Sequence, residues 1–210
     1  MTSFKTTLKI GLAASLLAMT TAASATTVSV TASATVDNAV DLTFTGALGF
    51  GTIRANISTA DDECVGLELE ADTTVTTLGT TPAGADFGTA CPAAGTSSIA
   101  SIDGAFERPE FSITGVPAFQ SLTITEPSSV ELTLTGNPSG EATFTLYDFT
   151  AYQTNSTPAE AVDLTSGTGT FTANVDGEVT FTIGATIATD ATASAVDDYQ
   201  DASYSGTFDV

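Results

Sequence analysis

Residues 111–146 read FSITGVPAFQSLTITEPSSVELTLTGNPSGEATFTL, and this stretch decides the fold class. Apolar residues recur at every second position between short breaks rich in Pro, Gly and Ser, as in a β-meander. Alternation by two places one set of side chains in a core and leaves the intervening Thr, Ser and Glu in water. The apolar positions are Phe111, Ile113, Leu122, Ile124, Val130, Leu132, Leu134, Ala142, Phe144 and Leu146.

Loop length fixes which of these side chains meet, because residues opposite each other in an antiparallel pair point to the same face. A three-residue loop over 127–129 sets Ile124 against Leu132 and Leu122 against Leu134, with all four facing the core. A two-residue loop would put one arm's apolar side chains in solvent. The sequence therefore predicts an antiparallel hairpin closed by residues 127–129.

A second hairpin is predicted around the Asp-Gly pair at 176–177. A three-residue loop from Val175 to Gly177, with Gly177 left-handed, sets Phe171 against Phe181 on the buried face. A two-residue turn would place the two rings on opposite faces. We therefore predict the longer loop.

Shorter alternating segments predict further strands, and residues 148–166 read as a polar surface connection. No amphipathic helical pattern follows residue 25, and the many Thr residues favour β structure. The expected fold is an all-β, antiparallel immunoglobulin-like β-sandwich. The additional predicted strands are 27–36, 40–44, 48–53, 65–69 and a last strand with Tyr204, Phe208 and Val210 on one face.

Residues 1–25 have the pattern of a secretory signal peptide. Lys5 and Lys9 precede a short apolar run over 10–19, and residues 23–25 form an Ala-Ser-Ala cleavage site. The apolar run is shorter than the roughly 20 residues of a membrane span. We expect a mature chain of residues 26–210, a single β-sandwich domain without a membrane span, exported to the periplasm, cell surface or medium.

The charge balance bears on partners. The two lysines lie in residues 1–25, so the mature chain has two arginines against 25 acidic residues, a net charge of −23. Nucleic acid is excluded as a partner because its binding needs clustered Lys and Arg. The acidic surface indicates solubility or capture of divalent cations. The densest cluster, residues 61–63, lacks the alternate spacing of a calcium loop, which favours solubility.

The chain has two cysteines, Cys64 and Cys91. In an exported protein such a pair predicts one disulfide, which across 26 intervening residues would contribute roughly 3 kcal/mol. The alternative is a pair of metal thiolates, but structural zinc takes four N or S ligands and the chain has no histidine. We expect a disulfide-stapled excursion over about 54–107, attached to a core that lies elsewhere.

Composition removes most catalytic chemistry. Without His there is no Ser-His-Asp or Cys-His nucleophile, and without Lys in the mature chain there is no Schiff base or Ser-Lys dyad. A pair of carboxylates, as in glycoside hydrolases, stays open by composition, although the absence of Trp counts against sugar hydrolysis. We expect no enzyme, no cofactor, no metal site and no small-molecule substrate.

Three motifs resemble those of the domain of unknown function 4402 group of exported bacterial proteins. Residues 48–53 match L-x-F-G-T-I, residues 111–115 match F-x-V-T-G, and residues 204–208 match Y-x-G-x-F. Order and spacing agree over most of the chain, while the stretch from Cys64 to Cys91 and an earlier C-terminus depart from the group. This group is similar to spore coat protein U and to archaic chaperone-usher pilins. The resemblance implies a sandwich used as a fibre or surface component, with no catalytic residue.

Two functions are therefore open. The first is an exported structural protein of the cell surface, a pilin-like or coat-like subunit whose partners are copies of itself. The second is a secreted monomeric binding module for a glycan or divalent cation.

The first apolar strand bears on the choice between them. It is either the first strand of a self-complete sandwich or a strand donated to the next copy. Small side chains in it favour the self-complete interpretation. Its alternating residues are Val28, Val30, Ala32, Ala34 and Val36.

Overall fold

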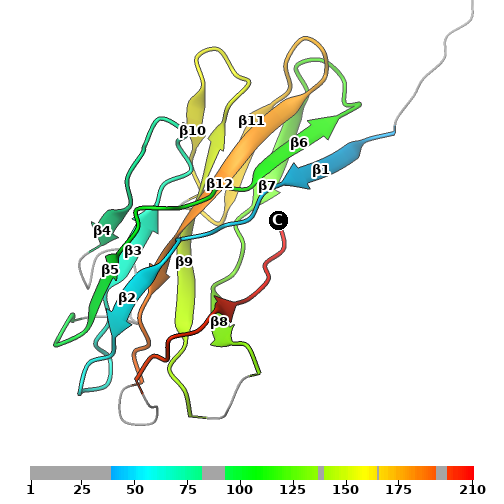
Figure 1. Ribbon diagram of the computed structural model, residues 1–210. Helices are drawn as coiled ribbons and strands as arrows, with labels where there is room; N and C mark the ends of the chain where they lie inside the picture. The colour runs from blue at the N-terminus through cyan, green and yellow to red at the C-terminus, as the bar shows by residue number, and fades with distance from the viewer. Residues whose placement is uncertain (1–38, 82–92, 137–139, 165, 193–197) are drawn as a thin grey trace, which may run out of the picture. The chain divides into compact units, whose positions relative to one another are not determined.

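The computed structural model describes residues 39–81, 93–136, 140–164, 166–192 and 198–210 (Figure 1). These residues belong to one compact unit, Asp37–Val210. Every regular element in the described ranges is a β-strand and every strand pair is antiparallel, which confirms the all-β prediction. No described helix is long and apolar enough to cross a membrane.

The two longest strands, β9 (Phe144–Gln153) and β12 (Val179–Ala188), pair with each other at the centre of the largest sheet. The register shifts between Gly184 and Thr186, which forms a bulge. Gly184 is required here, because a Cβ atom at that position would lie 2.0 Å from the carbonyl oxygen of Leu69. The bulge divides both strands into two halves with different neighbours.

The largest sheet has nine strands and is built outward from this pair. Beside the first half of β12 lie β6 and then β1, and beside its second half lie β3 and then β4; β9 carries β10 at one end and β8, then β13, at the other. The bounds are β1 Asp41–Thr45, β3 Gly66–Leu69, β4 Gly79–Thr81, β6 Glu110–Thr114, β8 Val130–Leu134, β10 Glu160–Val162 and β13 Tyr204–Ser205.

Two small sheets accompany the large one. The first pairs β7 (Ser121–Thr125) with β11 (Thr168–Thr172), and the second pairs β2 (Ile53–Asn56) with β5 (Ser98–Ser101). The β7–β11 pair packs on the large sheet through Phe171, whose ring stacks on that of Phe181 in β12 at 4.4 Å between centroids. Both rings are almost fully buried, as the alternation predicts.

Both predicted hairpins are wrong in their pairing. β7 pairs with β11 and not with β8, and β11 does not pair with β12, so Phe171 meets Phe181 between sheets and not within a ladder. The chain crosses to another sheet at 126–129 and again at 173–178. Alternation can place a residue in the core, but it cannot say which sheet the strand joins. The left-handed Gly177 is confirmed, with a φ of 74°.

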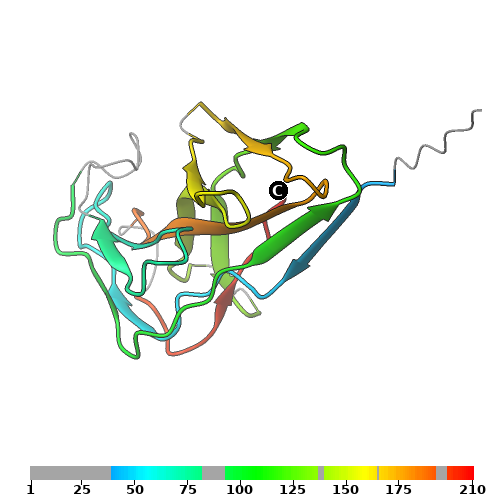
Figure 2. The same cartoon turned by 90° about the horizontal axis from the view of Figure 1, so that it is seen from above.

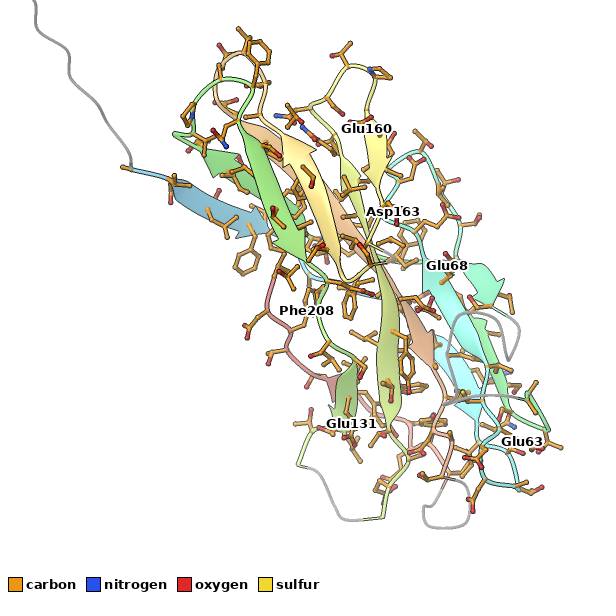
Figure 3. The ribbon with its side chains drawn as sticks, turned by 180° about the vertical axis from the view of Figure 1, so that it is seen from behind. Glu63, Glu68, Glu131, Glu160, Asp163 and Phe208 are labelled. Atoms are coloured by element: carbon orange, nitrogen blue, oxygen red, sulfur yellow. The ribbon has the colours of Figure 1, made fainter. Side chains whose placement is uncertain are left out.

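Three segments differ from the sequence prediction. Residues 148–153, expected as a surface connection, continue β9 and bury Phe149 and Ala151. Residues 48–52 form only an isolated bridge from Gly49 to Glu107, and the strand starts at Ile53. The last strand contains only residues 204–205. Beyond it, the ring of Phe208 packs on the ring of Phe149, with 5.1 Å between the ring centroids (Figure 3).

The stretch 54–107, expected as an excursion, supplies part of the core. Leu67 and Leu69 of β3 are 4% and 0% exposed, and they belong with Ile99 to the main hydrophobic cluster. β3 pairs directly with β12 over residues 185–188. The core therefore does not lie apart from this stretch, because β3 completes the sheet beside the second half of β12.

Replacing Gly177 by Ala is expected to destabilise the fold strongly. The left-handed backbone costs any Cβ-bearing residue about 1 kcal/mol. In addition, a Cβ atom at this position would lie 2.0 Å from the carbonyl oxygen of Val116. The matched control is Gly167→Ala, where φ is 80° and no atom lies within 4 Å of the new Cβ. Urea unfolding should show about 1 kcal/mol lost in the control and on the order of 2 kcal/mol more in Gly177→Ala; equal losses would mean that the contact with Val116 gives way freely.

Candidate assembly surface

The edge strand β1 and Val40, the residue before it, expose apolar side chains, and those of Leu42 and Phe44 lie on the core side of the sheet. Val40, Leu42 and Phe44 are 60%, 54% and 68% exposed, and they are named the stripe below. Leu42 is opposite Ile113 and Phe44 is opposite Phe111 in the antiparallel register with β6. Because residues opposite each other share a face, the stripe continues the buried face of β6 into solvent.

A row of phenylalanine rings traces this continuation from the core to the surface. The ring of Phe171 stacks on Phe181, Phe181 on Phe111 and Phe111 on Phe44, with centroid distances of 4.4, 5.0 and 5.8 Å. Exposure in the same order rises from 1% and 2% to 8% and then to 68%. The row of rings is therefore buried at its Phe171 end and exposed to solvent at its Phe44 end.

Backbone edges flank this opening. Among the described strands β1 pairs only with β6, and β7 pairs only with β11, so each has one edge outside the ladders. Unpaired N–H and C=O groups on such an edge can accept another strand. Figures 1 and 2 both place the C-terminus of the chain between β7 and β1.

A cleft of about 630 Å³ is lined in part by residues 48–55, which follow β1 in the sequence. One wall is residues 48–55, the other is residues 199–204, and the floor is apolar, with Leu132, Phe144 and Ile187. Both walls overlap the motifs at 48–53 and 204–208. The stripe and this cleft, both bordered by the segment 40–55, are named together the open side.

The 199–204 wall is held in place by Tyr199. Its ring stacks on Phe144 at 4.2 Å between centroids, and its hydroxyl donates to the carbonyl oxygen of Thr143 at 2.9 Å and accepts from the N–H of Asp190 at 2.6 Å. Burial raises the pKa of Tyr199 far above its ordinary value, so the hydroxyl stays neutral.

Asp190 joins this wall to β12 and to the segment before β9. Its side chain accepts hydrogen bonds from the N–H and hydroxyl of both Thr143 and Thr192, and the residue is 8% exposed. Burial by itself raises the pKa of Asp190, but the hydrogen bonds from Thr192 and Thr143 outweigh it and leave the pKa below its ordinary value. The ionised carboxylate therefore stabilises the folded state.

Replacing Asp190 by Asn should cost about 2 kcal/mol at pH 7, because a carboxylate that accepts several hydrogen bonds is lost. The folded pKa lies below the unfolded value near 3.8. The extra stability of the wild type is therefore complete above that pH and disappears as pH falls through the folded pKa. Thermal melts of both proteins between pH 7 and pH 2 should converge at the acid end; a gap independent of pH would show that the charge of Asp190 has no role.

The charged residues do not gather into a metal site in the described part of the chain. No group of three His, Cys, Asp or Glu residues is arranged to hold an ion there. Figure 3 shows the labelled acidic residues spread along the molecule, where Glu160 in β10 and Asp163 directly after it come from one stretch. Of the two arginines, Arg108 is engaged, with hydrogen bonds to the carbonyl oxygens of Glu70 and Val75, whereas Arg54 is exposed beside the cleft.

The residues singled out from the sequence lie partly outside the described ranges. Cys64 is 2% exposed and packs against Ala188, but Cys91 lies outside the described residues, so their pairing stays a prediction. The proposed first or donor strand, Val28, Val30, Ala32, Ala34 and Val36, lies outside them as well. The sequence does not predict that the stripe is exposed, because its apolar residues alternate with polar ones in the same way as in a strand covered by the core.

Comparison of the chain with protein-family models, with curated proteins and with solved structures finds no match. The likeness to the domain of unknown function 4402 group therefore stays a prediction from the three motifs.

Proposed function

We propose that this protein is an exported structural subunit of the cell surface, pilin-like or coat-like, whose copies join by adding a β-strand to the open side. The observation that carries the proposal is the exposed stripe on β1. Three large apolar side chains, more than half exposed, continue the aromatic core to solvent beside an edge strand. Natural proteins usually cover or charge such an edge, because it pairs readily with another chain.

The shape of the open side suits an extended strand. β1 carries the stripe and has one edge outside the ladders of the described strands, and the cleft presents Leu132, Phe144 and Ile187 between two walls of the chain. A strand bound there would place alternate side chains on the stripe and the floor, while its backbone pairs with an edge. Apolar side chains beside an unpaired strand edge favour a peptide over a compact ligand.

The segment with matching periodicity is Val28–Val36, just before β1. Its apolar residues alternate with Thr and Ser over nine residues, enough for a strand of roughly 30 Å. Three of the five alternate positions are Val, and the two central ones are Ala. Small residues favoured a self-complete strand on the expectation of a deep acceptor pocket, but the stripe is an open surface, on which Phe44 is 68% exposed, and it needs no large side chains to fill it. We propose that this strand comes from a neighbouring copy.

The wider architecture is proposed to be an immunoglobulin-like sandwich with one strand position left to be filled. Packing of β7–β11 on the large sheet through Phe171 and Phe181 supports two layers. Residues 1–25 would direct export, and a Cys64–Cys91 disulfide fits an oxidising compartment. The proposal assigns no catalytic residue.

A secreted binding module is the second candidate, and the cleft is the observation that favours it. Exposed Arg54 and the partly buried Tyr204 border a cavity large enough for a glycan ring. A glycan would stack on tyrosine and bind polar groups at the rim. Divalent cations have less support, because the described residues hold no cluster of ligands.

Deleting residues 27–36 from the mature chain should give a folded monomer that no longer associates. Sedimentation velocity would measure association, and far-UV dichroism would measure folding. A synthetic peptide of residues 27–36 should bind the shortened chain, because the open side is left vacant. A peptide with Val30→Asp and Val36→Asp is the control and should not bind. An aggregating, misfolded product would instead assign the strand to its own core.

A charge placed on the stripe provides a matched test within one strand. Leu42→Asp should weaken association, since it puts a carboxylate on the apolar face that receives the added strand. Thr43→Asp adds the same charge to the opposite face of β1 and should leave association unchanged. If full-length protein is monomeric at high concentration and the source cells carry no fibre or coat, the structural proposal is wrong and the binding module remains.

Replacing Cys64 and Cys91 by Ser should lower the melting temperature, because an entropic restraint worth roughly 3 kcal/mol is lost. Far-UV dichroism should still show β structure. Titration of free thiols in the denatured, unreduced protein checks the pairing directly and should find none. Two free thiols would refute the disulfide and leave Cys64 as a buried apolar side chain only.

A further inference from the structure

Two interlocked loops form one end of the compact unit, and they are named the tip. Residues 115–120 join β6 to β7, and residues 173–178 join β11 to β12. Three backbone hydrogen bonds tie the loops together: Val116 N–H to Gly177, Phe119 N–H to Asn174 and Ala173 N–H to Gln120. The tip is therefore a fixed platform, and it presents Phe119 and Val175, which are 70% and 69% exposed.

Phe119 is held in an unfavourable backbone conformation. The N–H of Gln120 donates to the carbonyl oxygen of Pro117 at 3.1 Å, which makes Phe119 the third residue of a turn, with a φ of 60°. That position favours Gly or Asn, and an aromatic residue with positive φ is uncommon. The backbone of Phe119 is therefore strained although its ring lies mostly in water. Such strain points to a contact of the ring outside its own chain.

The tip lies beside the point where the N-terminal segment joins the described structure. A Cβ atom on Gly115, the first tip residue, would lie 2.2 Å from the carbonyl oxygen of Ala39. Val36 precedes Ala39 by three residues, which span at most about 10 Å when extended. A copy that receives the strand 28–36 is therefore tethered close to the tip of the copy that donates it.

We propose that the tip is a second contact between successive copies, in which Phe119 and Val175 pack on the copy that receives the N-terminal strand. This inference rests on the proposed function. Copies with a net charge of −23 repel each other when brought together. Within the tip, residues 115–120 carry no charge, whereas the 173–178 loop carries Asp176 and Glu178 beside Val175. Phe119, on the uncharged loop, is therefore the residue best suited to the close approach that the tether imposes.

The variant Phe119→Asn separates an intermolecular role from a structural one. Asn suits the left-handed turn, so the monomer should melt at the same temperature as the wild type or higher. Self-association, measured by sedimentation velocity on the full mature chain, should weaken about tenfold because the ring is lost. Phe119→Tyr keeps the ring and the strain and should associate like the wild type. Val175→Thr tests the neighbouring side chain with little change in volume and should also weaken association.

The outcomes distinguish this inference from the proposed function. If the wild type associates, deletion of residues 27–36 abolishes it and Phe119→Asn associates normally, the tip contact is refuted and the strand addition stands. If Phe119→Asn lowers the melting temperature, the ring serves its own chain and the tip contact is likewise refuted. If the wild type never associates, both proposals fail together.

Discussion

The pairing of β9 with β12 is the interaction on which the rest of the structure depends. Each strand has ten residues, and the bulge at Gly184 changes the neighbours along β12 from β6 to β3. A side chain at Gly184 would meet the backbone of Leu69 and Ala71. One glycine therefore lets β3 approach the central strand, and through it the stretch 54–107 becomes part of the core.

The two halves of this central pair are covered by different kinds of contact. Beside the first half, phenylalanine rings from three strands and from β11 stack in one row. Beside the second half, Phe144 is covered by Tyr199 and Tyr204, and Asp190 holds Tyr199 in place by hydrogen bonds. Apolar burial is non-directional, whereas the Asp190 network fixes the position of the 199–204 wall.

The open side extends along both halves of the central pair. The stripe borders the first half and the cleft borders the second, and the continuous segment 40–55 lines both. A strongly acidic protein ordinarily keeps its copies apart, so the apolar stripe is a local exception to its electrostatics. Strand addition would cover that surface with both apolar contacts and backbone hydrogen bonds, which is why we prefer it to a small ligand.

The sequence by itself determined the all-β class and part of the core, because both follow from local alternation; it placed the core outside 54–107 and missed Phe149 and Ala151. Phe111, Phe171 and Phe181 were placed in the core correctly, and Gly177 was placed in a left-handed turn, since the strand period and the turn chemistry are properties of short segments. Tertiary structure alone decided which strands pair, because crossing between sheets at 126–129 leaves the alternation unchanged. It alone also distinguished β1 from a covered strand: Leu42 and Phe44 follow the same pattern as buried residues, and their exposure depends on what lies across from them.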